Sequence, residues 1–232
     1  RYLAYFQAYT STYAEVELLA SMYRQALAQS DMVGLCVGTR PDCVPPAALD
    51  LLTGYREEGY EVWLELGLQT AHDKTLKRIN RGHDFRCYQQ TAQRARQRGL
   101  KVCCHLIVGL PGETQRDHLL TLQRVVESGV DGIKLHPLHV VTGSTLARAW
   151  RAGRLPELAL EDYAVSAGEM IRHTPGEVVY HRLSASARRP TLLAPLWCEN
   201  RWRGMQAVGA YLQQYGVQGS ALDAALHYSP TL

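Results

Sequence analysis

The chain has 232 residues, of which 46% are hydrophobic, and a formal net charge of +3. A core of this size suits one large domain, and a nearly balanced charge does not by itself indicate nucleic-acid binding. No apolar run is long enough to span a membrane and no secretory signal opens the chain, so we expect a cytoplasmic protein. The six cysteines show no compact ligand spacing such as Cys-x-x-Cys. We expect them to be reduced and mostly core filler.

The first 140 residues alternate between strand and helix patterns. Apolar runs with period two predict strands, and the segments between them carry apolar residues at helical spacing. The predicted strands span residues 2–10, 32–37, 61–70, 101–108 and 132–138. The predicted helices span residues 14–30, 45–58, 85–98 and 117–128, with a shorter helix before residue 81. Five strand–helix units in succession indicate a parallel sheet covered by helices, either a barrel or part of one.

The regular alternation fades after residue 140. The pattern predicts a loop and helix at 143–153, a longer helix at 160–173, a further strand within 178–184 and a terminal helix at 205–215. Residues 188–203 between them are irregular, basic and aromatic. We interpret residues 1–140 as a core and residues 141–232 as a C-terminal extension with a possible extra strand and helices packing on that core.

The predicted strand at 61–70 has two different sides. Period two places Trp63, Glu65, Gly67 and Gln69 on one side and only aliphatic residues on the other. A carboxylate and an amide do not suit a dry core, because unpaired buried polar groups are costly. Ligands of parallel α/β folds bind at the carboxyl ends of the strands. The sequence therefore predicts a ligand pocket there, with candidate lining residues Gln7, Tyr9, Thr10, Arg40, Asp42, Glu65, Gln69, His105, Lys134 and His136.

Several of these side chains also have a purely structural explanation. An interior histidine such as His105 commonly serves as a hydrogen-bonded core residue. Glu65 would pair with Lys134 or Arg40, because a buried charge needs a partner. Arg40 would otherwise tie its loop to Asp42.

Two other function classes are open at this point. The first is an RNA-binding or RNA-modifying protein that grips its ligand through residues 181–203, where five arginines are interleaved with Trp197 and Trp202. A basic, partly packed surface explains the same segment without a ligand. The second is a cluster-free barrel lyase of aldolase type, in which Lys134 forms a Schiff base.

Five motifs in order carry a resemblance to a known family. They are Tyr-Phe-Gln-Ala-Tyr-Thr-Ser-Thr at 5–12, Gly-Thr-Arg-Pro-Asp at 38–42, Glu-Leu-Gly-Leu-Gln-Thr at 65–70, Asn-Arg-Gly-His at 80–83 and His-Leu-Ile-Val-Gly-Leu-Pro-Gly-Glu at 105–113. The chain resembles the YhcC-like branch of the radical-SAM proteins, whose core is similar to the elongator-type and oxygen-independent coproporphyrinogen oxidase members. The resemblance covers nearly the whole chain.

The resemblance implies an α/β fold, a partial (β/α)6 TIM-like barrel that binds S-adenosylmethionine (SAM) and a 4Fe–4S cluster. In such proteins the reduced cluster cleaves SAM to methionine and a 5′-deoxyadenosyl radical. For the intact protein we expect an unknown substrate, with RNA as one option, and an electron donor such as a flavodoxin.

The resemblance also implies roles for individual residues. Gln7, Tyr9 and Thr10 match the segment that meets the SAM amino group. Gln69 and Arg81 match residues that contact SAM, and an arginine suits its carboxylate. His105 stands where some relatives place a ribose-binding aspartate, and Ile107 stands where an aliphatic residue meets the adenine. The candidates for positioning the substrate or SAM are Arg40, Glu65, Lys134 and His136, with no general acid or base assigned.

The chain departs from the family pattern in three ways. The cluster motif Cys-x-x-x-Cys-x-x-Cys and the first barrel strand are absent. We expect both upstream of Arg1, so this N-terminally truncated core would hold no cluster and would be inactive in radical chemistry. Gly38 replaces a frequent glutamate and Tyr9 a usual glycine. No acetyltransferase domain follows the core, so elongator-type activity is not implied.

Overall fold

A computed structural model describes residues 1–7 and 10–222. The chain divides into two compact units. The first comprises Arg1–Ile107, Gln123–Lys134 and Val179–His181, and the second comprises Val108–Leu122, Leu135–Val178 and the chain from Arg182 onward. No described helix is long and apolar enough to cross a membrane.

A six-stranded sheet forms the centre of the fold. Its order, β1-β2-β3-β4-β5-β7, follows the chain, as expected for successive strand–helix units. The pairs β1–β2, β2–β3 and β3–β4 are parallel. The strands are β1 (Tyr2–Phe6), β2 (Met32–Thr39), β3 (Glu61–Gln69), β4 (Lys101–Val108), β5 (Gly132–Pro137) and β7 (Val179–Arg182). The predicted parallel sheet, including its sixth strand, is confirmed, although β1 ends earlier than the predicted strand at 2–10.

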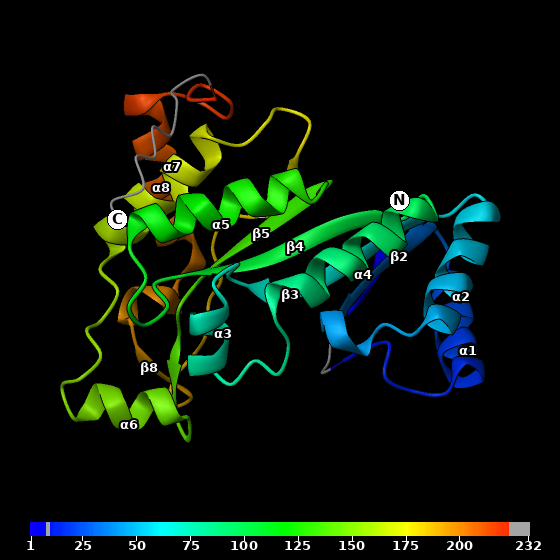
Figure 1. Cartoon of the computed structure of the whole chain (residues 1–232), viewed down its shortest axis with the longest axis horizontal. Coiled ribbons are helices and arrows are strands. Elements are labelled where there is room, and N and C mark those ends of the chain that lie inside the picture. The colour runs from blue at the N-terminus through cyan, green and yellow to red at the C-terminus, as the bar shows by residue number, and fades with distance from the viewer. Residues whose placement is uncertain (8–9, 223–232) are drawn as a thin grey trace. The chain divides into compact units, whose positions relative to one another are not determined.

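Helices connect the strands. They are α1 (Val16–Leu27), α2 (Pro46–Glu57), α3 (Asp73–Arg78), α4 (Phe85–Gln97) and α5 (Gln115–Glu127). Figure 1 shows α1, α2 and α4 beside β2 and β3, and each of the three contacts one of these strands. They cover the aliphatic side of β3, where Leu64, Leu66 and Leu68 are completely buried. The predicted division of β3 into an aliphatic and a polar side therefore agrees with the packing.

Two glycines of β2 shape the polar side of the sheet. At Gly34 an added Cβ would lie 1.9 Å from the Glu61 carbonyl oxygen, so a side chain there would push β3 away. Gly38 stands directly opposite Glu65 in the register of β2 and β3. An added Cβ at Gly38 would lie 3.2 Å from the Phe6 carbonyl oxygen, so the missing side chain lets β1 approach β2 closely.

The second unit contains a small sheet and the helices α6, α7 and α8. The strands β6 (Val140–Val141) and β8 (Leu192–Ala194) pair antiparallel. The helices are α6 (Thr145–Arg151), α7 (Leu160–Arg172) and α8 (Arg201–Tyr215). Helices α7 and α8 pack closely, and an added Cβ at Gly168 would lie 2.2 Å from the Tyr211 ring.

The segment at 188–203 is more ordered than the sequence suggested. It contains β8, a 3-10 helix (Leu196–Glu199) and the first residues of α8, which begins four residues before the predicted helix. Trp197 is buried and its indole N–H donates to the Leu158 carbonyl at 2.9 Å. Trp197 is therefore a core residue and does not offer a face for stacking on a nucleic acid.

Candidate functional site

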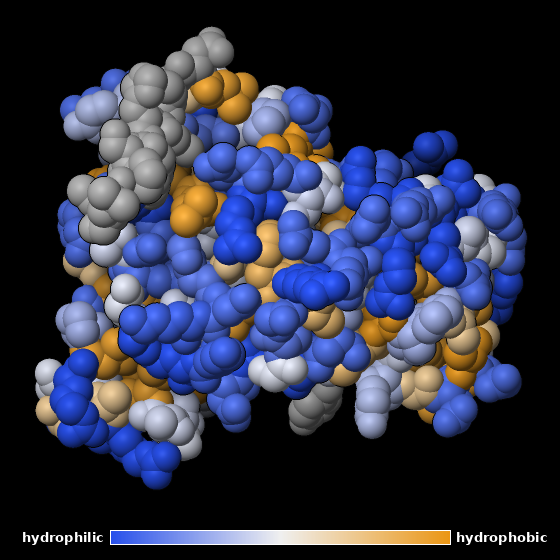
Figure 2. Space-filling model, viewed as in Figure 1, coloured by the Kyte–Doolittle hydropathy of each residue, from blue (hydrophilic) through white to orange (hydrophobic). Residues whose placement is uncertain are grey.

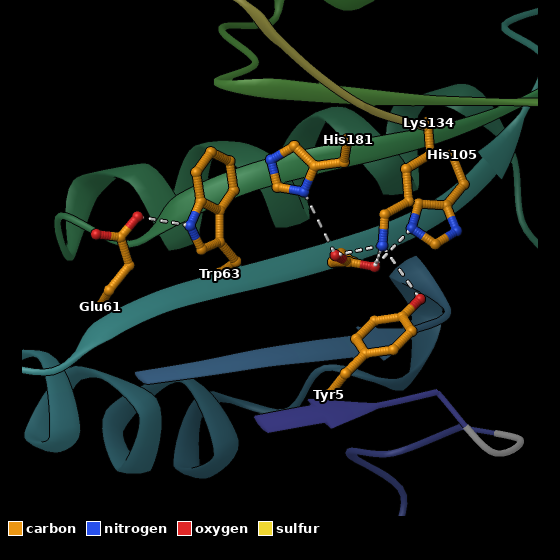
Figure 3. A network of polar contacts seen from close by, with 7 residues as sticks. Tyr5, Glu61, Trp63, His105, Lys134 and His181 are labelled. Atoms are coloured by element: carbon orange, nitrogen blue, oxygen red, sulfur yellow. Dashed lines mark hydrogen bonds and ion pairs between the residues drawn. The ribbon is translucent and has the colours of Figure 1, made fainter. Parts of the chain in front are cut away.

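A buried carboxylate joins the polar sides of four neighbouring strands. Glu65 on β3 is 1% exposed, and both of its oxygens accept from the Lys134 ammonium on β5 at 2.6 Å. His105 Nε2 on β4 lies 2.9 Å from one oxygen, and His181 Nδ1 on β7 lies 3.8 Å from the other. In Figure 3 the dashed lines from Lys134, His105 and His181 converge on this one carboxylate. All four residues belong to the first unit.

Aromatic side chains surround this network. The Lys134 ammonium donates to the Tyr5 hydroxyl at 3.2 Å and lies 4.3 Å from the centre of the Tyr5 ring (Figure 3). The Trp63 ring meets the His181 ring edge to face at 4.3 Å. Gly132 on β5 makes this contact possible, because an added Cβ would lie 2.8 Å from His181 and 3.0 Å from Trp63. The polar side of the sheet therefore carries a connected set of side chains from β1 to β7.

The network carries a fixed charge pair. Burial alone would raise the pKa of Glu65, but the hydrogen bonds from His105, His181 and Lys134 hold it well below its usual range. Burial alone would lower the pKa of Lys134, but Glu65 and Tyr5 together raise it. Burial and the neighbouring Glu65 raise the pKa of Tyr5. At neutral pH the three groups are therefore a carboxylate, an ammonium and a phenol, which suits orientation of a ligand better than proton transfer.

The charges of Glu65 and Lys134 also bear on two other possible uses of this site, a Schiff-base lysine and a metal centre. A Schiff-base lysine must be neutral to attack a carbonyl, whereas the pKa of Lys134 is raised by Glu65. Ligand atoms of Glu65, Cys103 and His181 lie within 4.8 Å of one another, a spacing that three ligands of one metal ion could have. However, the Lys134 ammonium already bonds both Glu65 oxygens, and burial and Glu65 raise the pKa of the Cys103 thiol. The arrangement is that of an ion pair rather than a metal centre.

The cysteines of this chain do not fit an iron–sulfur cluster. Cluster ligands are cysteine thiolates that lie close together, and no three of the six cysteines, all of which the structure describes, lie within ligand distance of one another. Cys36 and Cys103 pack against Trp63 as part of the core. Cys104 and Cys198 are also buried, and burial raises the pKa of each to about 12.

A second set of predicted residues meets at the carboxyl end of β3. The Arg81 guanidinium donates to the Gly67 carbonyl through Nε at 3.2 Å and Nη2 at 2.6 Å. Its Nη1 has no partner among the described residues. An added Cβ at Gly67 would lie 2.6 Å from Arg81 Nη2 and 3.0 Å from Gln69 Nε2. Gln69 has a φ of 81°, which is strained for a residue with a side chain and is typical of functional sites. The absent side chain of Gly67 thus brings Arg81 and Gln69 together, and the unpaired Nη1 fits a ligand carboxylate.

Arg40 supports this corner and does not reach Glu65. Its guanidinium makes two bonds to Asp42, at 3.0 and 2.6 Å. Burial alone would raise the pKa of Asp42, but Arg40 lowers it. An added Cβ at Gly82 would lie 2.7 Å from Arg40 Nη2, so the loop that carries Arg81 rests on Arg40. Of the two partners considered for Glu65, the structure selects Lys134.

The other predicted residues are spread over the chain. His136 belongs to the second unit, where its Nδ1 lies 2.7 Å from the Pro137 carbonyl and its ring contacts His139. Gln7 is exposed, and Thr10 and Ile107 are partly exposed. Tyr9 lies outside the described residues.

Sequence reasoning missed two members of the Glu65 network. Tyr5 shares a side of β1 with Gln7, so the period of two was a usable signal for placing it on the inner face. His181 had no comparable signal, because a four-residue strand is too short for its periodicity to be recognised.

Comparisons with known proteins agree with this architecture. The model of the radical SAM superfamily matches residues 1–125, and that of the Radical_SAM C-terminal domain matches residues 130–214. Protein YhcC of Escherichia coli K12 is 75% identical over 222 residues, which are 96% of this chain and 72% of the relative. The tRNA uridine(34) acetyltransferase of Dehalococcoides mccartyi is 35% identical over 130 residues, which are 55% of this chain and 28% of the relative.

A solved structure shares the fold. The Elp3 of the archaeon Methanocaldococcus infernus, with an N-terminal deletion, superimposes with a TM-score of 0.80 at 20% identity, over 92% of this chain. This chain spans about half the length of that one, 54%. The structural match confirms the predicted partial barrel of parallel strands, and the YhcC match confirms the predicted branch. The chain belongs to the radical SAM superfamily.

Proposed function

We propose that this chain is the core of a radical-SAM enzyme and that Arg81 and Gln69 bind SAM. The observation that carries the proposal is the Arg81 guanidinium, which is held on the Gly67 carbonyl with Nη1 unpaired among the described residues. Such an arrangement at the carboxyl end of a strand suits the SAM carboxylate. The buried Glu65–Lys134 pair would orient a substrate on the inner face of the sheet. When bound in the intact protein, the cluster and SAM supply the 5′-deoxyadenosyl radical.

The cluster would be held by cysteines outside residues 1–232. The six thiols of this chain are poor candidates, since no three of them lie close enough together to hold one cluster. Strand β1 pairs only with β2 in the described sheet and leaves Tyr2 65% exposed. An open strand edge with exposed aromatics is normally covered. We propose that a further strand of the intact protein pairs with β1 and brings the cluster ligands.

A second proposal concerns the substrate, which we infer to be RNA. The supporting observation is the 35% identity to a tRNA uridine(34) acetyltransferase over 130 residues, which cover about half of this chain. The Schiff-base alternative has less support, because the raised pKa of Lys134 keeps its amine protonated.

The first experiment uses the full-length protein under anaerobic conditions. The protein is reconstituted with iron and sulfide, SAM and dithionite are added, and 5′-deoxyadenosine is quantified. Cluster-dependent formation of 5′-deoxyadenosine is expected. A protein that binds a cluster and cleaves no SAM contradicts the proposal.

A matched pair of variants tests the role of Arg81. Loss of a charged hydrogen bond costs about 1.5–3 kcal/mol, so Arg81→Gln should weaken SAM binding by roughly tenfold to a hundredfold. Arg148→Gln, in α6 of the second unit, removes an exposed arginine elsewhere and should bind SAM like the wild type. Equal SAM affinities of the two variants would remove Arg81 from the site.

A further inference from the structure

The segment that follows β3 concentrates positive charge. Residues 73–86 contain five lysines or arginines and two aspartates, a net charge of +3 that equals the net charge of the whole chain. The rest of the chain is therefore neutral in sum. The exposed cations of this segment are Lys74, Lys77 and Arg78 on α3 and Arg86 in the first turn of α4, and we call these four residues the α3 rim.

The surface cations of the first unit differ in whether they have acidic partners. In the first unit Arg24 pairs with Glu58 at 2.6 Å and Arg98 pairs with Asp50 at 2.9 Å. In contrast, the side chains of Lys74, Lys77 and Arg86 make no ion pair or hydrogen bond within the described part of the chain. Unpaired cations that gather in one place are typical of a surface that binds a polyanion.

The two aspartates of the segment are used within the fold. Asp73 accepts from the backbone N–H of Phe85 at 2.8 Å, and Asp84 caps α4 by accepting from the backbone N–H of Cys87 at 2.8 Å. Their side chains therefore point to backbone groups and not to the rim cations. The charges of Lys74, Lys77 and Arg86 are therefore available to an external partner.

A groove beside the rim leads to the candidate site. It has a volume of about 530 Å³, and its lining includes Lys77, Asn80, Arg81 and His83. Three aspartates also line it, of which Asp42 is paired with Arg40 and Asp73 and Asp84 accept from backbone N–H groups. An ammonium, an amide, a guanidinium and an imidazole are the groups that commonly contact phosphate oxygens of nucleic acids. Arg81 is the residue that bonds the Gly67 carbonyl at the end of β3, so this groove adjoins the proposed SAM site. In the view shared by Figures 1 and 2, α3 and α4 face the viewer and the surface over them is mostly hydrophilic.

We propose that the α3 rim and its groove bind the phosphate backbone of the RNA substrate. This inference rests on the proposed RNA substrate and adds the surface that holds it. The rim cations are long, exposed and flexible, which suits contacts to successive phosphates of a polymer rather than enclosure of a single phosphate. Its place at the carboxyl end of β3 puts the polymer beside the site where chemistry is proposed.

The basic segment of the second unit is the weaker candidate. Arg189 there is paired with Glu199 at 3.1 Å, and Arg201 lies 5.0 Å over the Trp202 ring. Trp197 is buried, so of the two tryptophans only Trp202 is exposed for stacking. The two segments belong to different units and are tested separately.

The test compares two triple variants of the full-length protein. Lys74→Gln/Lys77→Gln/Arg86→Gln removes three rim charges, and Arg188→Gln/Arg201→Gln/Arg203→Gln removes the same number from the second unit. Binding of an in vitro transcribed tRNA is measured as a function of salt, after circular dichroism has shown that each variant is folded. The rim variant should lower the slope of log K against log salt by about three, roughly one for each phosphate that is no longer neutralised, while the control variant keeps the wild-type slope.

Each outcome decides the proposal. Wild-type binding by the rim variant overturns it, and so does a slope change confined to the second-unit variant. The wild-type protein is also assayed for SAM cleavage. A wild-type protein that cleaves SAM but binds no tRNA contradicts the rim proposal and supports the radical-SAM proposal. A wild-type protein that binds tRNA through the rim but cleaves no SAM supports the rim proposal and contradicts the enzyme proposal.

Discussion

The buried Glu65–Lys134 ion pair allows a specific prediction about the free energy of unfolding of the first unit. Replacing Glu65 with glutamine keeps the shape of the side chain and removes its charge. The Lys134 ammonium, whose side chain is 10% exposed, then loses its counter-ion in the interior. His105 and His181 cannot substitute for the carboxylate, because an imidazole carries no negative charge. Glu65→Gln should therefore destabilise the first unit strongly.

The size of the effect follows from the geometry. At a separation of 2.6 Å the Coulomb attraction is roughly 6 kcal/mol for an effective dielectric constant near 20. Desolvation offsets much of this attraction, and breaking a buried pair from one side costs about 3–5 kcal/mol. The amide oxygen of Gln still accepts one hydrogen bond, so we expect a loss of about 3 kcal/mol. Removing both charges in Glu65→Gln/Lys134→Met should cost clearly less than the two single changes together, because no unpaired charge is left.

Urea unfolding followed by circular dichroism measures these changes. Glu58→Gln is a matched control, since Glu58 forms an ion pair with Arg24 at the same 2.6 Å distance but at the exposed surface. This control should leave the unfolding midpoint close to that of the wild type. The reasoning is refuted if Glu65→Gln is no more destabilising than Glu58→Gln, or if the effects of the Glu65 and Lys134 changes simply add.

Four further predictions concern the sheet, the mouth of the site and the thiols. Gly34→Ala should lower the free energy of unfolding by about 3 kcal/mol or prevent folding, because its Cβ would meet the Glu61 carbonyl. Gly54→Ala in α2 should be neutral or stabilising, because an added Cβ there has nothing within 4 Å, and thermal unfolding compares the two variants. Gly67→Ala should weaken SAM binding measured by calorimetry, since its Cβ displaces Arg81, and an unchanged affinity would contradict the proposed site. The lowered pKa values of Glu65 and Asp42 contribute stability that is present above the unfolded-state value near 4, so the urea midpoint should fall as pH drops below about 5 and fall less in Glu65→Gln. A thiol reagent should modify the partly exposed Cys43 and Cys87 first, and a fast phase that survives Cys43→Ser/Cys87→Ser would show that a buried cysteine is accessible.

Local periodicity allowed much of the first unit to be predicted. The alternation along 61–69 is a property of any strand, so it indicated that Glu65 and Gln69 share a side opposite the leucines. The contact between Arg40 and Asp42 joins residues two apart and needs no knowledge of the fold. The structure of the second unit was harder to predict. Its strands β6 and β8 have only two and three residues, and they pair although they are far apart in the sequence.

The sequence by itself therefore determined the order of strands and helices, the polar side of β3 and the family. Only the tertiary structure decided which cation neutralises Glu65, since Lys134 lies 69 residues away and reaches it through the order of β3, β4 and β5. It also brought in Tyr5, 129 residues from Lys134, and His181 on β7. Periodicity states which side of a strand a residue occupies, but the neighbours across the sheet depend on strand order and register, which are settled by packing over the whole chain.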